Sequence, residues 1–382
     1  MSSLRINLED CGKQFEKKGL FSHLNLQNMF SKLILCVIAV MAFQNANSQT
    51  FKQKMTEHTS NIETVTISND GKFMATGAWD GHIHLYTFDS LGNPVMKSTY
   101  TGHLGAVISL SFSANNKYLV SSSKDYSSRI WNIDTPAKHK VFNLHLEPVT
   151  ASFIDPSYKY IISASLDGTI RTTNINDPLK SKVIKLSGPI NDLQLSRDKK
   201  FFYAAVKGGI VKKIETAGKN NEVMSFIGHT DEVNALELSP DGNFMATASN
   251  DKTIQIWNIS TGKSVKILNG FEWKVTSLKY SSDGKYIIGG CNNGVTKLFN
   301  SETGKLVSDF NDLGKNVRDV TFSRDGKLIF VATLMDGDKF GAVIYNSGVE
   351  STPVSGTSAT KTKPSQAAKS QPAKTTKLNG SK

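Results

Sequence analysis

The stretch GHTDEVNALELSPDGNFMATASNDKTIQIWN, residues 228–258, holds the pattern on which the architecture of this chain depends. Within it, Val233–Leu238 alternates apolar and polar side chains with a period of two, which is typical of a β-strand. Phe244–Ala248 and Thr253–Trp257 each follow a tight turn, and a fourth run, Ser264–Leu268, lies just beyond. Short runs joined by turn residues predict four antiparallel strands.

The corner after the first of these strands recurs seven times along the chain. Successive corners begin 45, 42, 41, 43, 42 and 42 residues apart. A fixed period of about 40–45 residues indicates one supersecondary unit repeated side by side, because a single unit cannot bury its apolar faces alone. We therefore predict seven units in one domain. The corners are Ser68–Gly71, Ser113–Asn116, Asp155–Tyr158, Ser196–Lys199, Ser239–Gly242, Ser281–Gly284 and Ser323–Gly326.

Copies two and five share a Gly-His pair, an aspartate in the turn before the third strand, and a Trp-Asn pair at the end of that strand. These residues resemble the motif of the WD-repeat family of β-propellers. The resemblance implies an all-β fold: a single seven-bladed β-propeller of four-stranded antiparallel blades. It also implies a hydrogen-bonded tetrad in each of the two blades, with donors from a histidine and an indole N–H. The tetrads are His103, Ser121, Asp125 and Trp131, and His229, Thr247, Asp251 and Trp257.

The other copies keep the period but lose parts of the motif. Tyr86 in copy one and Thr173 in copy three stand where the tryptophan is expected. Copy four has Gly208 at the aspartate position, and Phe271 replaces the histidine in copy six. The prediction of seven blades therefore rests on spacing.

The N-terminal region has the pattern of a secretory signal peptide. Met29–Lys32 is a short basic start, Leu33–Phe43 is an apolar run, and a small polar stretch ends at Ser48. We expect residues 1–48 to be a leader with its true start at Met29 and a cut after Ser48. The apolar run would span roughly 16 Å, against a bilayer core of about 30 Å. This favours a periplasmic or extracellular protein. Anchoring by residues 33–43 and a cytoplasmic location are the alternatives.

The last copy ends near Tyr345, one strand short of four. Phe51–Met55 follows the expected cut directly, and we expect it to pair with the strand Phe340–Tyr345 and so close the ring. On this reading the propeller covers residues 49–348.

Residues 349–382 have a different composition, rich in Ser, Thr, Pro and Lys. Six lysines and no acidic residue lie between Ser351 and Lys382. This composition predicts a disordered basic tail, which accounts for about half of the net charge of +12. We expect at most weak membrane contact through this tail, and it contains no nucleic-acid-binding motif.

No pattern of catalytic or metal-ligating residues stands out from the repeat. His82 and His84 share one strand face without a third ligand, so we expect no metal, no cofactor and no enzyme activity. Loss of Cys11 and Cys36 with the leader would leave Cys291 without a disulfide partner. The alternative is an exported propeller enzyme or ligand receptor with its site at the central channel. Its candidate residues are Asn61, Glu63, Thr150, Asn191, Asp192 and Asn234.

Two of the four tryptophans, Trp79 and Trp273, lie outside the tetrad positions, in turns that the resemblance places on one rim. Large apolar side chains gathered on one exposed face are typical of a protein-binding site. We predict a non-catalytic scaffold, monomeric as a propeller, that presents this rim to a protein partner. The alternative is that each ring packs on a neighbouring blade. The candidate rim residues are Trp79, Lys124, Leu166, Lys207, Trp273 and Met335.

Overall fold

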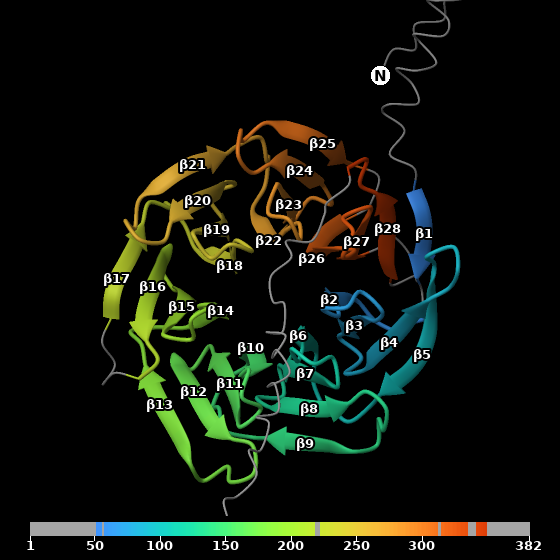
Figure 1. Ribbon diagram of the computed structural model, residues 1–382, viewed down its shortest axis with the longest axis vertical. Coiled ribbons are helices and arrows are strands. Elements are labelled where there is room, and N and C mark those ends of the chain that lie inside the picture. The colour runs from blue at the N-terminus through green and yellow to red at the C-terminus, as the bar shows by residue number, and fades with distance from the viewer. Residues whose placement is uncertain (1–50, 56, 218–221, 312–314, 335–340, 350–382) are drawn as a thin grey trace, which may run out of the picture. The chain divides into compact units, whose positions relative to one another are not determined.

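The computed structural model describes residues 51–55, 57–217, 222–311, 315–334 and 341–349. These residues form 28 strands, which pair into seven four-stranded sheets and include no helix. The seven sheets are arranged radially around a central opening, and one strand of each sheet lies next to that opening (Figure 1). The predicted fold, an all-β seven-bladed propeller of four-stranded antiparallel blades, is confirmed. The described part of the chain accordingly has no helix of the length and apolarity that a membrane crossing requires.

Each blade runs from its channel strand outward, and blades are numbered in chain order. Blades 1 to 4 consist of β2 (Ile62–Ile67), β3 (Met74–Ala78), β4 (Ile83–Phe88) and β5 (Pro94–Tyr100); β6 (Val107–Phe112), β7 (Tyr118–Ser123), β8 (Ser128–Asn132) and β9 (His139–Phe142); β10 (Val149–Ile154), β11 (Tyr160–Ser165), β12 (Thr169–Asn174) and β13 (Ser181–Lys185); β14 (Ile190–Leu195), β15 (Phe201–Val206), β16 (Ile210–Glu215) and β17 (Glu222–Ile227). Blades 5 to 7 consist of β18 (Val233–Leu238), β19 (Phe244–Ser249), β20 (Ile254–Asn258) and β21 (Ser264–Leu268); β22 (Val275–Tyr280), β23 (Tyr286–Cys291), β24 (Thr296–Asn300) and β25 (Leu306–Phe310); and β26 (Lys315–Phe322), β27 (Leu328–Leu334), β28 (Gly341–Asn346) and β1 (Phe51–Met55).

The outer strand of blade 7 comes from the other end of the described chain. Its sheet has the order β1-β28-β27-β26, so β1 is the neighbour of β28. Met55 at the end of β1 is buried and packs in one cluster with Phe330 of β27 and Ile344 of β28. That this strand holds the ring closed remains a prediction, and its test is given in the Discussion.

The seven corners share a local geometry that explains their recurrence. In blade 5, the hydroxyl of Ser239 donates to Asp241 Oδ1 at 2.5 Å and accepts from the backbone N–H of Phe244 at 2.9 Å. Gly242 then turns the chain with a φ of 76°, a conformation that glycine adopts without steric cost. The Ser-x-Asp-Gly sequence therefore encodes the turn between the first two strands of the blade.

The apolar core is divided among the junctions between blades. Trp257 and Met245 of blade 5, for example, are buried in one cluster with Tyr203, Val211 and Phe226 of blade 4. Because the second strands are buried along almost their whole length, each blade depends on its neighbours for burial. The loops at the ends of the strands are therefore attached to tightly packed blades.

The turns of each blade fall at two opposite ends, because neighbouring strands are antiparallel. The corners and the turns between third and fourth strands lie at one end, which we call the corner face. The turns between second and third strands and the connections between blades lie at the other end, which we call the rim. Trp79 and Trp273 both belong to the rim.

Candidate protein-binding rim

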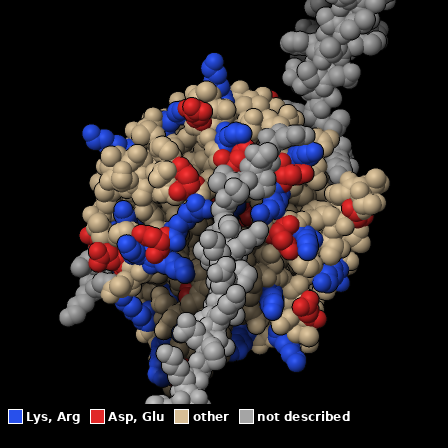
Figure 2. All heavy atoms as spheres, in the orientation of Figure 1, with Lys and Arg blue, Asp and Glu red and all other residues tan. Residues whose placement is uncertain are grey.

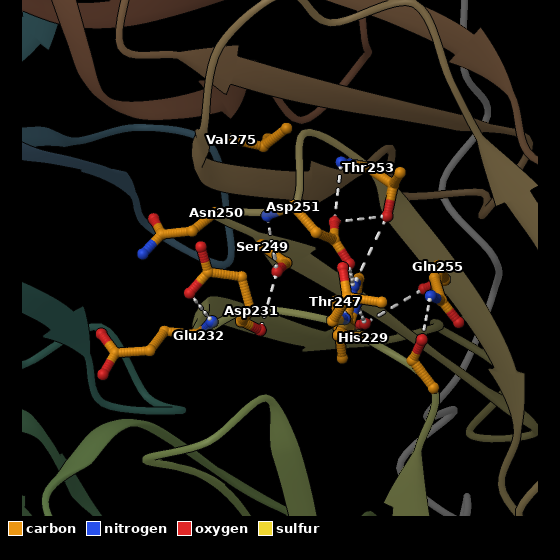
Figure 3. Close-up of polar contacts among 12 residues, drawn as sticks. His229, Asp231, Glu232, Thr247, Ser249, Asn250, Asp251, Thr253, Gln255 and Val275 are labelled. Atoms are coloured by element: carbon orange, nitrogen blue, oxygen red, sulfur yellow. Dashed lines mark hydrogen bonds and ion pairs between the residues drawn. The ribbon is translucent and has the colours of Figure 1, made fainter.

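The tetrad of blade 5 joins two rim loops of that blade. His229 Nδ1 lies 2.6 Å from Asp251 Oδ2, and His229 Nε2 lies 2.7 Å from the hydroxyl of Thr247. The indole N–H of Trp257 donates to the same hydroxyl at 2.8 Å. Figure 3 shows His229 linked to Thr247 and Asp251 at the end of the blade. The structure thus brings together the four side chains that the sequence singled out.

Blade 2 has the same arrangement. His103 Nδ1 lies 2.7 Å from Asp125 Oδ2, His103 Nε2 lies 2.7 Å from the hydroxyl of Ser121, and Trp131 Nε1 donates to that hydroxyl at 2.8 Å. Burial raises the pKa of Asp125, but hydrogen bonds from His103 and Ser127 outweigh it and hold the pKa well below its ordinary value. The carboxylate is therefore ionised at neutral pH.

These aspartates also fix the loops that carry the rim side chains. Asp125 accepts a hydrogen bond from the backbone N–H of Leu104 at 3.0 Å, and Asp251 accepts one from that of Thr230 at 3.2 Å. Both donors belong to the residue directly after the tetrad histidine. Each blade connection is thereby tied to the neighbouring turn of the same blade.

Blade 1, which has Tyr86 at the tryptophan position, contains a second buried histidine, His84. His58 keeps its bonds to Asp80 and Thr76, while His84 stacks on His58 with ring centroids 3.9 Å apart and an angle of 9° between ring planes. The Tyr86 hydroxyl lies 3.4 Å from His84 Nδ1. Burial, with a smaller contribution from His58, lowers the pKa of His84 to about 4. His84 thus packs as a neutral ring.

Trp79 lies on the rim within a frame of charged side chains. Its backbone N–H donates to the carbonyl of Asn61 at 2.9 Å, and its indole N–H donates to Glu63. The Lys124 ammonium lies 4.9 Å from the ring centroid, and the Arg318 guanidinium carbon lies 5.9 Å from it, both within cation–π range. The side chain nevertheless remains 42% exposed. The ring is held in place and still accessible.

Trp273 is 58% exposed and lies in the connection into blade 6. In this blade Phe271 stands at the position of the tetrad histidine. Phe271 is buried, and its ring centroid lies 5.8 Å from that of Phe299. The backbone carbonyl of Trp273 accepts a hydrogen bond from the thiol of Cys291 at 3.2 Å. The main chain is therefore anchored while the indole faces outward.

A family model described as "WD domain, G-beta repeat" matches residues 49–87, 95–132, 137–172 and 220–258. Each matched segment combines the outer strand of one blade with the first three strands of the next, which are those of blades 1, 2, 3 and 5. A second model, "Anaphase-promoting complex subunit 4 WD40 domain", matches residues 268–323. The chain belongs to the WD-repeat family. The matched segments include both complete tetrads.

Named relatives of this WD-repeat chain include subunits of larger assemblies. "Target of rapamycin complex subunit LST8-1" of Arabidopsis thaliana is 30% identical over 220 residues, which are 56% of this chain and 72% of the relative. "Target of rapamycin complex subunit wat1" of Schizosaccharomyces pombe is 23% identical over 52% of this chain and 65% of its own length. "Actin-interacting protein 1" of Drosophila melanogaster is 27% identical over 55% of this chain, but only 35% of that protein is matched.

The remaining rim candidates of this WD-repeat protein differ in exposure. Lys124 and Lys207 are exposed. Leu166 is only partly exposed, and its backbone N–H donates to the carbonyl of Pro148 at 3.0 Å. Its part in partner binding stays a prediction. Met335 lies outside the described residues.

Two exposed rim residues of the WD-repeat fold were not predicted from the sequence. Leu104 is 93% exposed and Leu146 is 80% exposed. Both directly follow the tetrad histidine of their blade, where Thr230 stands in blade 5. The His-Leu pairs could have indicated them, because a large apolar residue directly after an anchored histidine lies at the tip of a blade connection.

Four of the six polar residues proposed for a channel site connect neighbouring blades of the WD-repeat ring, whereas Glu63 accepts from the indole of Trp79 and pairs with Arg318. The amides of Asn191 and Asn234 donate to backbone carbonyls of the next blade at 2.9 and 2.7 Å, and the hydroxyl of Thr150 does so at 2.8 Å. Asp192 accepts from the N–H of Leu236 at 2.9 Å. Within the described ranges, no group of three or more His, Cys, Asp or Glu side chains could hold a metal ion.

Basic and acidic side chains are intermingled on the face of the WD-repeat propeller drawn in Figure 2. A surface that binds the phosphates of nucleic acid needs clustered positive charge. The face drawn in Figure 2 shows no such cluster of positive charge.

Proposed function

We propose that this WD-repeat chain is a non-catalytic scaffold that binds a protein partner on its rim. The observation that carries the proposal is the accessible indole of Trp79, held between Lys124, Arg318 and Glu63 on a turn that the contact between Asp80 and His58 anchors. Aromatic side chains in a fixed orientation lose little conformational freedom on binding, and so contribute much of the affinity of protein interfaces. Leu104 on the adjoining blade connection extends the apolar area.

The comparisons support this proposal at the level of the family. Two of the relatives are named as subunits of a complex and a third as an interacting protein. We propose the same general role for this chain, with a protein partner that those names do not specify. An enzyme or ligand receptor with a site in the channel is the less favoured alternative, because Thr150, Asn191 and Asp192 are occupied in contacts between blades.

We further propose that the protein acts in the cell envelope or outside the cell. The support is the signal-peptide pattern of residues 29–48, which lie outside the described residues. The rim proposal does not depend on this location, because the loops involved belong to the propeller.

Quantitative affinity capture tests the rim directly. Tagged wild type is compared with Trp79→Ala and Trp273→Ala, and with Leu179→Ala as the matched control, since Leu179 is 97% exposed but lies in a turn of the corner face. Proteins that bind the rim should be recovered by wild type and by the control, and lost with either tryptophan variant. If folded tryptophan variants recover the same proteins as wild type, the rim is not the binding surface.

A further inference from the structure

A groove between blades 5 and 6 opens on the corner face, at the opposite end of the strands from the rim. Its cavity has a volume of about 600 Å³. The walls are formed by Phe244 of β19, Ile256 of β20, Val265 of β21 and Tyr280 of β22. Val265 is 50% exposed although it is apolar. A cavity of this size and lining suits a few side chains or a small ligand.

The mouth of this groove carries more negative than positive charge. Asp241, Asp283 and Glu302 line it, with Lys266 as the single cation. The Lys266 ammonium is already engaged with the next blade, where it donates to the backbone carbonyls of Ser301, at 3.5 Å, and Glu302. With Lys285, which pairs with Asp283 from outside the lining, three carboxylates face two ammonium groups, so the groove keeps a negative excess.

One of these carboxylates is both buried and incompletely bonded. The Asp283 side chain is only 4% exposed. Its Oδ1 accepts from the Ser281 hydroxyl at 2.7 Å and from the Lys285 N–H at 3.1 Å. Its Oδ2 accepts no hydrogen bond from the described residues, and the ammonium of Lys285 lies 3.5 Å away on a side chain that is 64% exposed. A buried carboxylate oxygen favours a closer donor.

At two other junctions of the ring, an arginine side chain packs against the next blade through its aliphatic carbons. At the second corner position, Arg197 of blade 4 and Arg324 of blade 7 lie against the corner glycine of the next blade. A Cβ placed on Gly242 would lie 3.3 Å from Arg197 Cδ, and one placed on Gly71 would lie 3.0 Å from Arg324 Cβ. Blade 5 has Pro240 at this position, and blades 1, 2, 3 and 6 have Asn69, Ala114, Pro156 and Ser282. The junction between blades 5 and 6 is thus one of five without an arginine here.

The loss of this arginine coincides with a larger cavity. The groove between blades 7 and 1, which Arg324 lines, measures about 360 Å³. The groove between blades 5 and 6, bordered by Pro240, measures about 600 Å³. The difference leaves room for a long side chain from outside.

We propose that the groove between blades 5 and 6 binds an arginine or lysine side chain of a partner protein, together with an adjacent apolar residue. The cation approaches Asp283 and Asp241, and the apolar residue covers Phe244 and Val265. The excess of carboxylates in the lining favours a basic segment over an acidic one. This interface lies apart from the rim and does not require the rim to bind anything.

The test uses two dipeptides as probes on the full chain. Acetyl-Phe-Arg-amide and acetyl-Phe-Glu-amide are titrated while the methyl NMR signals of Val265 and Ile256 are followed. Pro240→Arg installs the arginine that blades 4 and 7 carry, and its backbone is already accommodated at Arg197 and Arg324. The matched control is Asp325→Asn, at the corner of blade 7.

We expect the arginine probe to shift both methyl signals saturably, and the glutamate probe to bind at least tenfold more weakly. Binding of the arginine probe should be lost in Pro240→Arg and unchanged in Asp325→Asn. Equal binding of both probes, unchanged binding in Pro240→Arg, or no movement of either signal at millimolar probe would overturn the proposal. Rim variants such as Trp79→Ala should bind the arginine probe normally, which separates this outcome from that of the scaffold proposal.

Discussion

Asp319 in the channel strand of blade 7 accepts a hydrogen bond from the backbone N–H of Val65 in blade 1, at 3.0 Å. The same carboxylate oxygen accepts from the hydroxyl of Thr64 at 3.0 Å. Asp192 makes the equivalent bond from blade 4 to the N–H of Leu236 in blade 5, at 2.9 Å. A contact that joins consecutive blades elsewhere thus joins the last blade to the first on the channel side.

Substitution of Asp319 should therefore weaken the junction where the ring closes. In Asp319→Ala, the N–H of Val65 and the hydroxyl of Thr64 lose their acceptor, so we expect the free energy of unfolding to fall by about 1–3 kcal/mol. Urea denaturation measures this loss. Asp192→Ala is the control for the same bond away from the junction. Hydrogen exchange at Val65 should accelerate in Asp319→Ala and not in Asp192→Ala; equal protection of Val65 in both would contradict the assignment.

Lys279 should stabilise the channel more strongly at high pH than at low pH. Its ammonium lies 2.9 Å from Glu237 Oε2 and faces Asp192 and Asp319, whose pKa values burial raises to about 6. The folded protein binds these two protons more readily than the unfolded chain does. Their contribution to stability is therefore present at low pH and lost as the pH rises through about 6.

Lys279→Met removes the cation that offsets those two carboxylates once they ionise. We expect it to lower the free energy of unfolding by about 1 kcal/mol more at pH 8 than at pH 5, a modest figure because 40% of the Lys279 side chain is exposed. Lys212→Met, which breaks the Lys212–Glu222 pair (2.8 Å) on the outer strands, is the control. An equal loss at both pH values for Lys279→Met would show that only the Glu237 pair matters.

His84 should make blade 1 sensitive to acid. Its pKa of about 4 lies below the ordinary 6.5, so the folded protein binds this proton less readily than the unfolded chain. Stability is therefore lost as the pH falls from about 6.5 towards 4, by at most about 3 kcal/mol. His84→Phe keeps a ring stacked on His58 and removes the titration.

The comparison of interest is the difference between wild type and His84→Phe across pH. Relative to wild type, the variant should gain about 2–3 kcal/mol in free energy of unfolding between pH 7.5 and pH 4.5. His82→Phe provides the control, since the His82 side chain is 41% exposed. A constant difference between wild type and His84→Phe at all pH values would mean that the pKa of His84 is the same in the folded and the unfolded protein.

The sequence predicted the blades because each corner is a local device: Ser239, Asp241 and Gly242 bond and turn within one short segment. It did not predict the ring of His84 lying on His58, since that contact joins separate strands and replaces a motif residue by a different chemistry. The groove beside Pro240 likewise depends on the residues that blade 6 contributes. Contacts between blades cannot be predicted from the repeat motif that the blades have in common.

The complete tetrads were predictable for a related reason. His229, Asp251 and Trp257 keep the spacing of the WD-repeat motif within one blade, so the resemblance to that family implied the tetrad. The exposure of Leu104 depends instead on how far a blade connection projects, which no spacing determines. Site residues on the rim were therefore predicted only where, as for Trp79, a large ring broke the pattern of the copies.

The position of the predicted cut after Ser48 can be tested together with the role of β1. A chain that starts at Gln49 keeps all of β1, whereas one that starts after Met55 loses it. Met55 is 1% exposed and packs with Phe330 and Ile344. Its removal would leave a cavity and expose the backbone of β28. We expect deletion of residues 1–48 to leave the free energy of unfolding unchanged, and deletion of residues 1–55 to lower it by about 3 kcal/mol or more.

Met55→Ala separates the side chain from the strand, and should cost about 2–4 kcal/mol in the chain that starts at Gln49. Edman sequencing of the protein from its native cells gives the mature N-terminus independently. A mature start at Gln49 agrees with export and with an intact β1. A start beyond Met55 in a stably folded protein would show that the ring closes without this strand, through contacts such as that between Asp319 and Val65.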